Sequence, residues 1–428
     1  MHRLTFRANF TWALLGNLVS GFAQWSIIVL LARLGDLSMV GQYSLGLAIV
    51  SPVIILTSLN LRTLLVTDLG ERFEFGHYLG MRLLTSAAAL SIIAALMWAG
   101  NYNRETRIVI LCVAAAKCLD AISDIVYGHL QRKEAMDRVA LSLMARGVLS
   151  TAALVSSLLA TRSLPWAAFL VASSSAAVLL LFDLCHLPLP RFPRFTGIWP
   201  HLRALVCLAG PPGFILMLVS LNSVLPRYWL AHFKSEGEVG LFSALAYLTI
   251  GANIMVVALG QASGPAMTRA WDRRDLFGFC ARAGRLALLG ALLGLAGIAA
   301  AIFHGPRIVR LFYGSRYAAD PAALLWLMIG GALAYLASCA GYTLSSARCF
   351  RTQLPMHLAV SVAISAACWE LVPKYGVWGA AVAQATGSAV QLAISVVLVA
   401  KLCWTLAGDS PLRASLIQFS ANPFSRPQ

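Results

Sequence analysis

The chain has 428 residues, of which 59% are hydrophobic and only 12% charged, and its mean hydropathy is +0.76. A soluble fold of this length cannot bury so much apolar surface, since about a quarter of the residues of soluble domains are charged, so the composition predicts a membrane protein. The net charge of +16 is typical of loops that face anionic lipid headgroups, and we expect membrane lipids and no nucleic acid as partners.

Twelve apolar segments are long enough to cross a membrane, which takes about 20 residues in a helix. The first six lie near residues 10–34, 40–66, 79–99, 107–128, 139–161 and 165–184, and the other six near 203–230, 240–267, 283–303, 322–346, 355–372 and 377–403. The first segment is too long for the apolar part of a signal peptide, so it should remain as a span. We therefore predict an all-α polytopic membrane protein with about twelve transmembrane helices in two six-helix bundles.

A proline-rich joint at residues 185–202 separates the predicted bundles, 1–184 and 203–403, and a polar tail follows at 404–428. The stretch from Leu31 to Ser44 recurs from Leu230 to Ser243 without a gap. This repetition predicts two halves with the same orientation, and parallel repeats of this kind usually place the substrate path between them. In the ninth segment, Gly290 and Gly294 have the spacing of a close helix–helix contact.

The distribution of Lys and Arg predicts the orientation. Most of the cations that lie outside the apolar segments or near their ends, Arg82 among them, fall on the side that holds the N-terminus. By the positive-inside rule, both termini should be cytoplasmic.

Charged residues inside the spans are the candidate functional residues, because each costs at least about 2.5–3.5 kcal/mol at bilayer depth. In the fourth segment Lys117, Asp120 and Asp124 share one helix face. They line an aqueous cavity, or Lys117 and Asp120 form a structural pair, and the two interpretations are compatible. Arg62 and Arg146 lie closer to segment ends, where reaching toward the interface is the alternative to a functional role.

Polar residues of the first segment, Asn17 and Gln24, share a face with Gly21, which suits a cavity wall or a bond between helices.

Enzyme motifs are absent from the sequence: there is no P-loop, HExxH, GxSxG or GxGxxG. The nine cysteines have no metal-ligand spacing, and the longest loop leaves no room for a catalytic domain. We expect neither catalytic activity nor a metal or cofactor.

Several stretches resemble bacterial lipopolysaccharide and exopolysaccharide (O-antigen type) flippases. They include Leu61-Arg62, the run from Phe75 to Arg82, the run from Lys117 to Gly147, and Gly260-Gln261-Ala262-Ser263. These flippases belong to the multidrug/oligosaccharidyl-lipid/polysaccharide exporter superfamily, whose fold is two six-helix bundles around a V-shaped cavity.

This resemblance implies a transporter that flips polyprenyl-pyrophosphate-linked oligosaccharides across the inner membrane by alternating access. Lys117, Arg146 and Arg62 would contact the anionic headgroup, and Asp120 and Asp124 would hold these cations or exchange a proton. A polysaccharide polymerase and glycosyltransferases would be partners. The alternatives are an ion-coupled drug exporter of the same superfamily, a membrane polysaccharide polymerase or ligase, and a structural scaffold.

Overall fold

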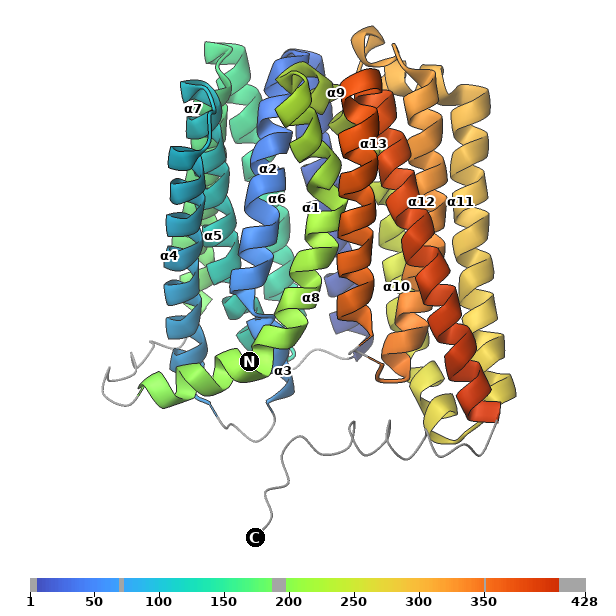
Figure 1. The fold of residues 1–428 in the computed structure, drawn as a ribbon. Coiled ribbons are helices and arrows are strands. Elements are labelled where there is room, and N and C mark those ends of the chain that lie inside the picture. Colours follow the sequence, from blue (N-terminus) through green and yellow to red (C-terminus); the bar gives the residue numbers. More distant parts are fainter. Residues whose placement is uncertain (1–5, 69–72, 187–197, 350–351, 408–428) are drawn as a thin grey trace. The chain divides into compact units, whose positions relative to one another are not determined.

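The computed structural model describes residues 6–68, 73–186, 198–349 and 352–407, and the regular structure in these ranges is helical (Figure 1). The α-helices are α1 (Phe6–Leu34), α2 (Leu37–Ser58), α3 (Leu61–Thr67), α4 (Phe75–Ala99), α5 (Arg104–Arg132), α6 (Met136–Thr161), α7 (Leu164–Val178), α8 (Ile198–Phe233), α9 (Glu236–Tyr247), α10 (Ile250–Asp272), α11 (Leu276–Phe312), α12 (Pro321–Ser346) and α13 (Gln353–Ala407). A π-helical turn, Leu179–Asp183, and a short 3-10 turn, Leu184–His186, extend α7.

The predicted membrane spans all fall on helices of the described part of the chain. Ten helical stretches there are long and apolar enough to cross a membrane. One of them, Gln353–Trp404, turns sharply at Gly376 (φ 54°, ψ −126°) and so contains the last two predicted spans. The prediction of an all-α, multi-pass membrane protein is confirmed.

Packing divides the chain into two units, each of which is described by itself. The first comprises Met1–Ala244 with Phe312–Gly314, and the second comprises Leu245–Leu311 with Ser315–Gln428. The predicted joint at 185–202 and tail at 404–428 lie largely outside the described residues. The division at that joint therefore stays a prediction.

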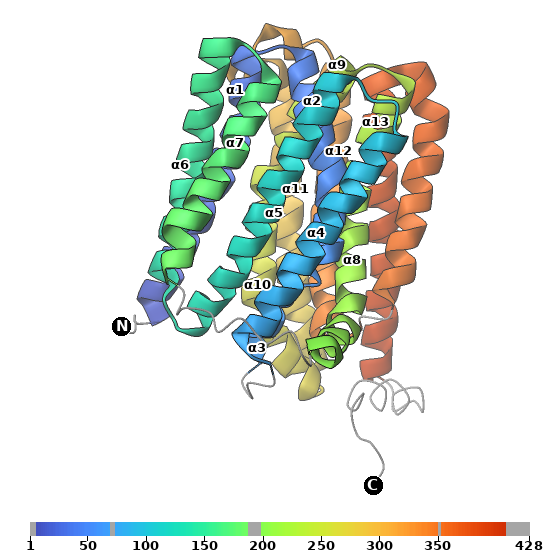
Figure 2. The ribbon, with the colours of Figure 1, turned by 90° about the vertical axis from the view of Figure 1, so that its left-hand side faces the viewer.

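In the first unit, α1 packs on α6, α6 on α7, α7 on α5, and α5 on α2 and α4 (Figure 2). Helix α5 thus lies among several neighbours, which allows charged side chains on it to meet partners from other helices. Helix α8 packs on α2.

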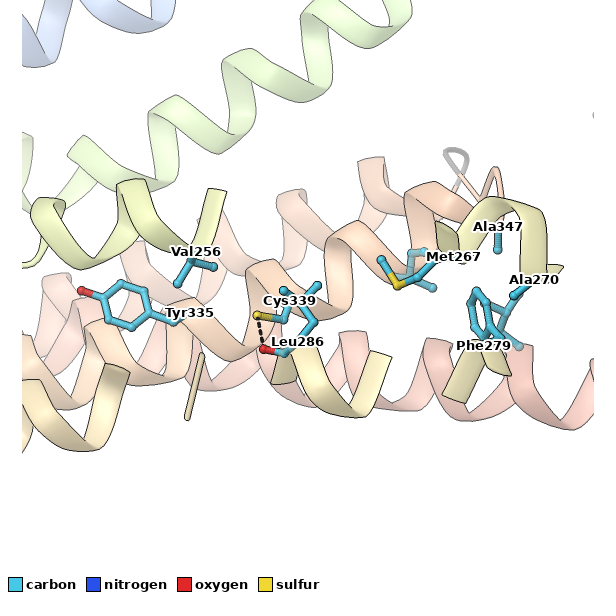
Figure 3. Packing of buried hydrophobic residues seen from close by; sticks show 10 residues of the cluster. Val256, Met267, Ala270, Phe279, Leu286, Tyr335, Cys339 and Ala347 are labelled. Atoms are coloured by element: carbon cyan, nitrogen blue, oxygen red, sulfur yellow. Dashed lines mark hydrogen bonds between the residues drawn. The ribbon is translucent and has the colours of Figure 1, made fainter. Parts of the chain in front are cut away.

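The core of the second unit joins α10, α11, α12 and the end of α13 (Figure 3). Cys339 of α12 donates its thiol hydrogen to the Leu286 carbonyl of α11, with 3.4 Å between sulfur and oxygen. A methyl group on Gly290 would lie 2.9 Å from the Cys339 sulfur, and one on Gly294 would touch Ala332. The predicted small-residue contact of the ninth span is therefore present.

Pro52 lies inside α2 and has no N–H, so the carbonyl of Ala48 loses its helical partner. The hydroxyl of Tyr228, on α8, donates a hydrogen bond to this carbonyl at 2.5 Å. A carbonyl without a partner in a membrane interior is costly, so Tyr228 compensates for the proline.

Tyr228→Phe should therefore lower the free energy of unfolding by about 1–2 kcal/mol, the cost of leaving one buried carbonyl unpaired. Denaturant titration of the purified chain in detergent measures this change. Tyr375→Phe is the matched control, because Tyr375 is 55% exposed. Equal stability of the two variants would contradict the assigned role of Tyr228.

The second span of each predicted half is interrupted, whereas the sequence predicted continuous helices. The first break lies between α2 and α3, where Leu59 and Asn60 both have φ near 49°. The second lies between α9 and α10 at residues 248–249, where the Tyr335 hydroxyl donates to the Thr249 carbonyl at 2.6 Å. Each break thus lies in the second span of its predicted half, but the two are not equivalent in the repeat, because residues 248–249 correspond to residues 49–50 of the first copy. Irregular backbone at membrane depth is tolerated where it is buried in protein or lines a cavity.

The two copies of the internal repeat contact each other within the first unit. A methyl group on Gly41 would collide with the backbone of Glu236, and one on Gly240 would collide with the backbone of Leu37. Leu37 and Glu236 occupy equivalent positions of the repeat, as do Gly41 and Gly240. Such reciprocal contact is what a two-fold relation between equivalent surfaces produces.

The carboxylate of Glu236 strengthens this contact. It accepts hydrogen bonds from Ser38 at 3.1 Å and Gln42 at 2.9 Å, both on α2. It also accepts from Thr106 at 2.6 Å and Asn103 at 3.4 Å, at the start of α5. The beginning of α9 is thus bonded to two helices of the predicted first half.

Candidate functional site

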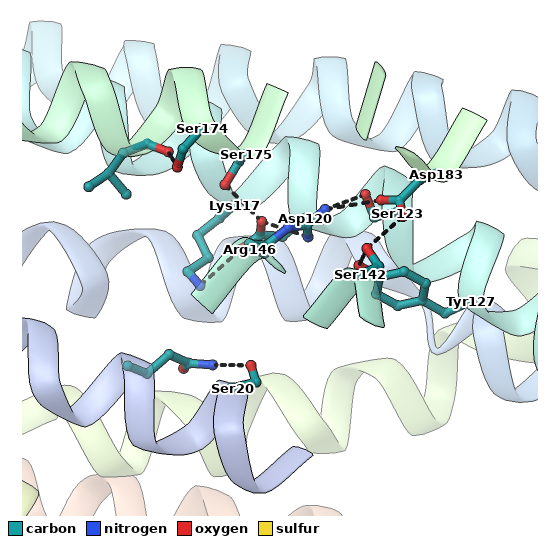
Figure 4. Close-up of polar contacts among 12 residues, drawn as sticks. Ser20, Lys117, Asp120, Ser123, Tyr127, Ser142, Arg146, Ser174, Ser175 and Asp183 are labelled. Carbon is teal, nitrogen blue, oxygen red and sulfur yellow. Dashed lines mark hydrogen bonds and ion pairs between the residues drawn. The ribbon is translucent and has the colours of Figure 1, made fainter. Parts of the chain in front are cut away.

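Asp120 of α5 joins three helices of the first unit (Figure 4). Lys117 Nζ lies 3.2 Å from its Oδ2, and Arg146 Nη1, from α6, lies 2.9 Å from its Oδ1. Ser175 of α7 donates to the same Oδ1 at 3.2 Å. Lys117 and Asp120 therefore form the pair that their spacing predicted, and Arg146 belongs to it.

Arg146 continues this network to a second carboxylate, Asp183. Its Nη2 lies 3.2 Å from Asp183 Oδ2 and donates to Ser123 Oγ at 2.6 Å. Asp183 also accepts from Ser142 Oγ at 2.6 Å, and that hydroxyl is hydrogen-bonded to Tyr127. Arg146 is 11% exposed and Asp183 only 1%, so this part of the network is buried.

Asp183 was not among the predicted site residues. It ends the π-helical turn of the sixth span, and such turns occur frequently at functional sites. The signal in the sequence was a single acidic residue closing an apolar run, but its partner Arg146 lies on another helix. No spacing within one span could have connected the two.

Asp124 forms a second group one helical turn along α5. Arg62 Nη1 lies 2.9 Å from Asp124 Oδ1, and the Arg62 Nε and Nη2 atoms donate to Gln131 Oε1 at 3.2 and 3.0 Å. Arg62 is the second residue of α3, directly after the break at Leu59 and Asn60, and its side chain reaches α5.

Arg82 approaches the same carboxylate from α4, with its Nη2 4.0 Å from Asp124 Oδ2. We expected Arg82 among the cations on the cytoplasmic side, and that sidedness stays a prediction. In the structure α4 begins at Phe75, about two turns earlier, and the Arg82 side chain is 2% exposed, so it is buried within the unit. The sequence placed Arg82 close to the start of its apolar segment, because Phe75, Gly76 and His77 do not form an apolar run, although they are helical.

Asn17 and Gln24 lie apart from both groups. Each is exposed on α1 and bonds within that helix, Asn17 Nδ2 to the Ala13 carbonyl at 2.7 Å and Gln24 Nε2 to Ser20 Oγ at 3.4 Å. Their role in a cavity stays a prediction.

The charges of the two groups differ in balance. Around Asp120 and Asp183 stand Lys117 and Arg146, so cations and carboxylates are equal in number. Around Asp124 stand Arg62 and Arg82, which leaves one positive charge in excess. Two cations are accessible, Lys117 with 32% of its side chain exposed and Arg62 with 31%. An anion can therefore reach this cluster.

A metal centre has no support in the described part of the chain, where no group of three or more His, Cys, Asp or Glu side chains could hold an ion.

Comparison with known proteins shows the family. The profile of the family described as "Polysaccharide biosynthesis protein" matches residues 6–271, a range that contains the whole charged cluster. This chain belongs to that family. The capsular polysaccharide biosynthesis protein CapF of Staphylococcus aureus is 22% identical to it over 381 residues, which cover 87% of the chain and 94% of CapF.

Solved structures with low sequence identity share the fold. The inward-facing conformation of a multidrug resistance MATE family transporter of the MOP superfamily superposes with a TM-score of 0.75 at 14% identity, covering 93% of this chain and 99% of the transporter. The inward closed conformation of the lipid II flippase MurJ gives 0.72 at 12% identity, covering 96% of this chain and 93% of MurJ. This chain thus has the fold of these solved proteins, as the resemblance implied.

Proposed function

We propose that this chain flips polyprenyl-pyrophosphate-linked oligosaccharides across the bacterial inner membrane for polysaccharide synthesis. It is a transporter without catalytic activity, and both of its termini are cytoplasmic. The observation that supports this function best is the intramembrane cluster of four cations and three carboxylates in a member of the polysaccharide biosynthesis family. CapF and MurJ, by their names, act in capsule synthesis and lipid II flipping, which favours a lipid-linked sugar as the cargo.

The chemistry of the cluster suits a pyrophosphate. A phosphate anion in a low-dielectric site requires cations, and an arginine side chain offers two parallel N–H donors to its oxygens. Lys117 and Arg62 would contact the phosphates, because about a third of each side chain is exposed. Arg146 already has three acceptors, which favours a positioning role behind Lys117, and direct contact with the headgroup stays a prediction.

Transport would proceed by alternating access. The phosphate oxygens of the headgroup would replace the carboxylates of Asp120 and Asp124 as partners of the cations. The polyprenyl tail would remain in lipid. The membrane potential assists export of an anion by about 2.3 kcal/mol per charge per 100 mV, so the cycle does not require a coupled ion. Glycosyltransferases would supply the cargo, and a polysaccharide polymerase would consume it.

Proteoliposomes that carry a labelled polyprenyl-pyrophosphate oligosaccharide test this function. Lys117→Ala and Arg62→Ala should each lower the flipping rate by about tenfold or more, the equivalent of one charge-assisted contact. Lys374→Ala is the matched control, because Lys374 is an exposed cation that pairs with Glu370 at the surface. Rates equal to that of the control would exclude these residues from the site.

The runner-up function is ion-coupled drug export, which the MATE-like fold favours at the level of the fold alone. Asp120 or Asp124 would then be the coupling acid. A strain without this chain would become drug-sensitive if it were an exporter, and would lose surface polysaccharide if it were a flippase.

A further inference from the structure

Arg82 lies in the membrane-spanning part of α4, about two helical turns from its start at Phe75. Its side chain is 2% exposed. Tyr78 and Met81, on the same helix, belong to an apolar cluster with Leu61 and Ile125 of α3 and α5. A guanidinium in such surroundings has lost its hydration, so its partners must replace that stabilisation.

The partners of Arg82 within the described residues do not replace it. The distance from its Nη2 to Asp124 Oδ2, 4.0 Å, is too long for a hydrogen bond. Its Nε is buried and has no hydrogen-bond partner. Asp124 also makes a shorter contact, at 2.9 Å, with the competing guanidinium of Arg62.

Two arginines from different helices therefore converge on one carboxylate, which can neutralise one of them. Arg62 is 31% exposed and donates three hydrogen bonds to Asp124 and Gln131, whereas Arg82 is buried and lacks such bonds. An uncompensated buried charge destabilises a protein, so a bound anion here would relieve a cost that the fold otherwise carries. This asymmetry distinguishes the Asp124 group from the balanced group around Asp120.

We infer that Arg82 and Arg62 form a phosphate-binding site, in which the bound anion competes with Asp124 for the two guanidinium groups. The ligand class is a phosphate or pyrophosphate ester, whose oxygens accept the paired N–H donors of arginine. The assignment to the pyrophosphate of the lipid-linked cargo depends on the proposed function. Asp124 lies one turn, about 6 Å, closer than Asp120 to the membrane side on which α5 ends and α1 begins, so a headgroup from that side reaches Arg62 and Arg82 before Lys117.

Thermal unfolding of the full chain in a neutral detergent, with inorganic pyrophosphate as the probe, tests this site. Pyrophosphate should raise the unfolding temperature of the native chain. Arg82→Gln should weaken the apparent affinity for pyrophosphate by about tenfold or more. Without pyrophosphate this variant should be at least as stable as the native chain, because it removes an uncompensated charge and leaves the pair of Arg62 and Asp124 intact.

A purely structural arginine gives the opposite pattern. Arg82→Gln would then unfold at a lower temperature without pyrophosphate and keep the native affinity, and this result would overturn the inference. Arg227→Gln is the matched control: Arg227 lies in α8 and donates to Ser243 and to the Ser223 carbonyl, so this variant should keep the native affinity.

Asp124→Asn provides an independent test if Arg82→Gln does not fold. Removal of the competing carboxylate should strengthen pyrophosphate binding, and unchanged or weaker binding would contradict the site.

A further arm adds an anionic phospholipid to the detergent in place of pyrophosphate. Stabilisation by the phospholipid and not by pyrophosphate would assign Arg82 to a membrane lipid headgroup and overturn its assignment to the cargo. Failure here is distinct from failure of the proposed function: a native chain that flips its cargo while Arg82→Gln binds pyrophosphate normally refutes only the site.

Discussion

Arg146→Met should lower the free energy of unfolding by about 3–5 kcal/mol, because it leaves the carboxylate of Asp183 buried without a cation. Asp183 is 1% exposed, and Arg146 is its one ion-pair partner among the described residues. Asp120 loses a contact of 2.9 Å in the same variant but keeps Lys117. The change is measurable by denaturant titration in detergent.

The double variant Arg146→Met/Asp183→Asn should recover most of this loss, since neutral partners do not leave a buried charge. Lys117→Met is the matched control, because it removes the other cation that contacts Asp120. We expect this variant to lower the free energy of unfolding by about 1 kcal/mol or less, because Lys117 is 32% exposed. A loss in Arg146→Met no greater than that in Lys117→Met would show that Asp183 does not depend on Arg146.

Gly240→Val should also cost about 3 kcal/mol or more, because its side chain would meet backbone atoms that cannot rotate away. The atoms in question are the Leu37 carbonyl and the Gly41 amide. Gly341→Val is the matched control in another span, since nothing lies within 4 Å of a methyl group placed there. The loss of folded protein on size-exclusion chromatography and the unfolding temperature both report the difference.

Gly41→Val should behave like Gly240→Val, because the two glycines meet each other from equivalent positions of the repeat. Tolerance of both substitutions would contradict the close approach of α2 and α9.

Hydropathy was sufficient to predict that these stretches are helical, because an apolar stretch in lipid must form its own backbone hydrogen bonds. The same property does not reveal breaks within a span. Leu59 and Asn60 lie within a predicted span although both have positive φ, and Leu248 and Thr249 form a turn within another. Such breaks depend on tertiary partners such as Tyr335, which lies far away in the sequence.

The candidate site was predictable where its residues share a helix. Lys117, Asp120 and Asp124 follow a spacing that places them on one face of α5, and the structure pairs the first two. Asp183 and Arg82 were missed because their partners lie on other helices. A charge near the end of a span has the same local sequence whether it reaches the interface or turns inward to a partner.

The internal repeat was visible in the sequence, and in the structure its two copies meet at Gly41 and Gly240. Both positions require glycine for the same reason, since two backbones approach there without space for a side chain. Glu236 adds four acceptor contacts to this point in one copy of the repeat, where the other copy has Leu37.

The most direct test of the central claim measures which leaflet holds the lipid-linked oligosaccharide in cells. Spheroplasts with and without the chain are treated with a membrane-impermeant reagent that modifies sugars, and the modified fraction of the lipid-linked pool is determined. Loss of the chain should raise the total pool and leave it protected from the reagent, and the native chain, but not Lys117→Ala, should restore access. An equally accessible pool in cells with and without the chain would contradict its role as a flippase.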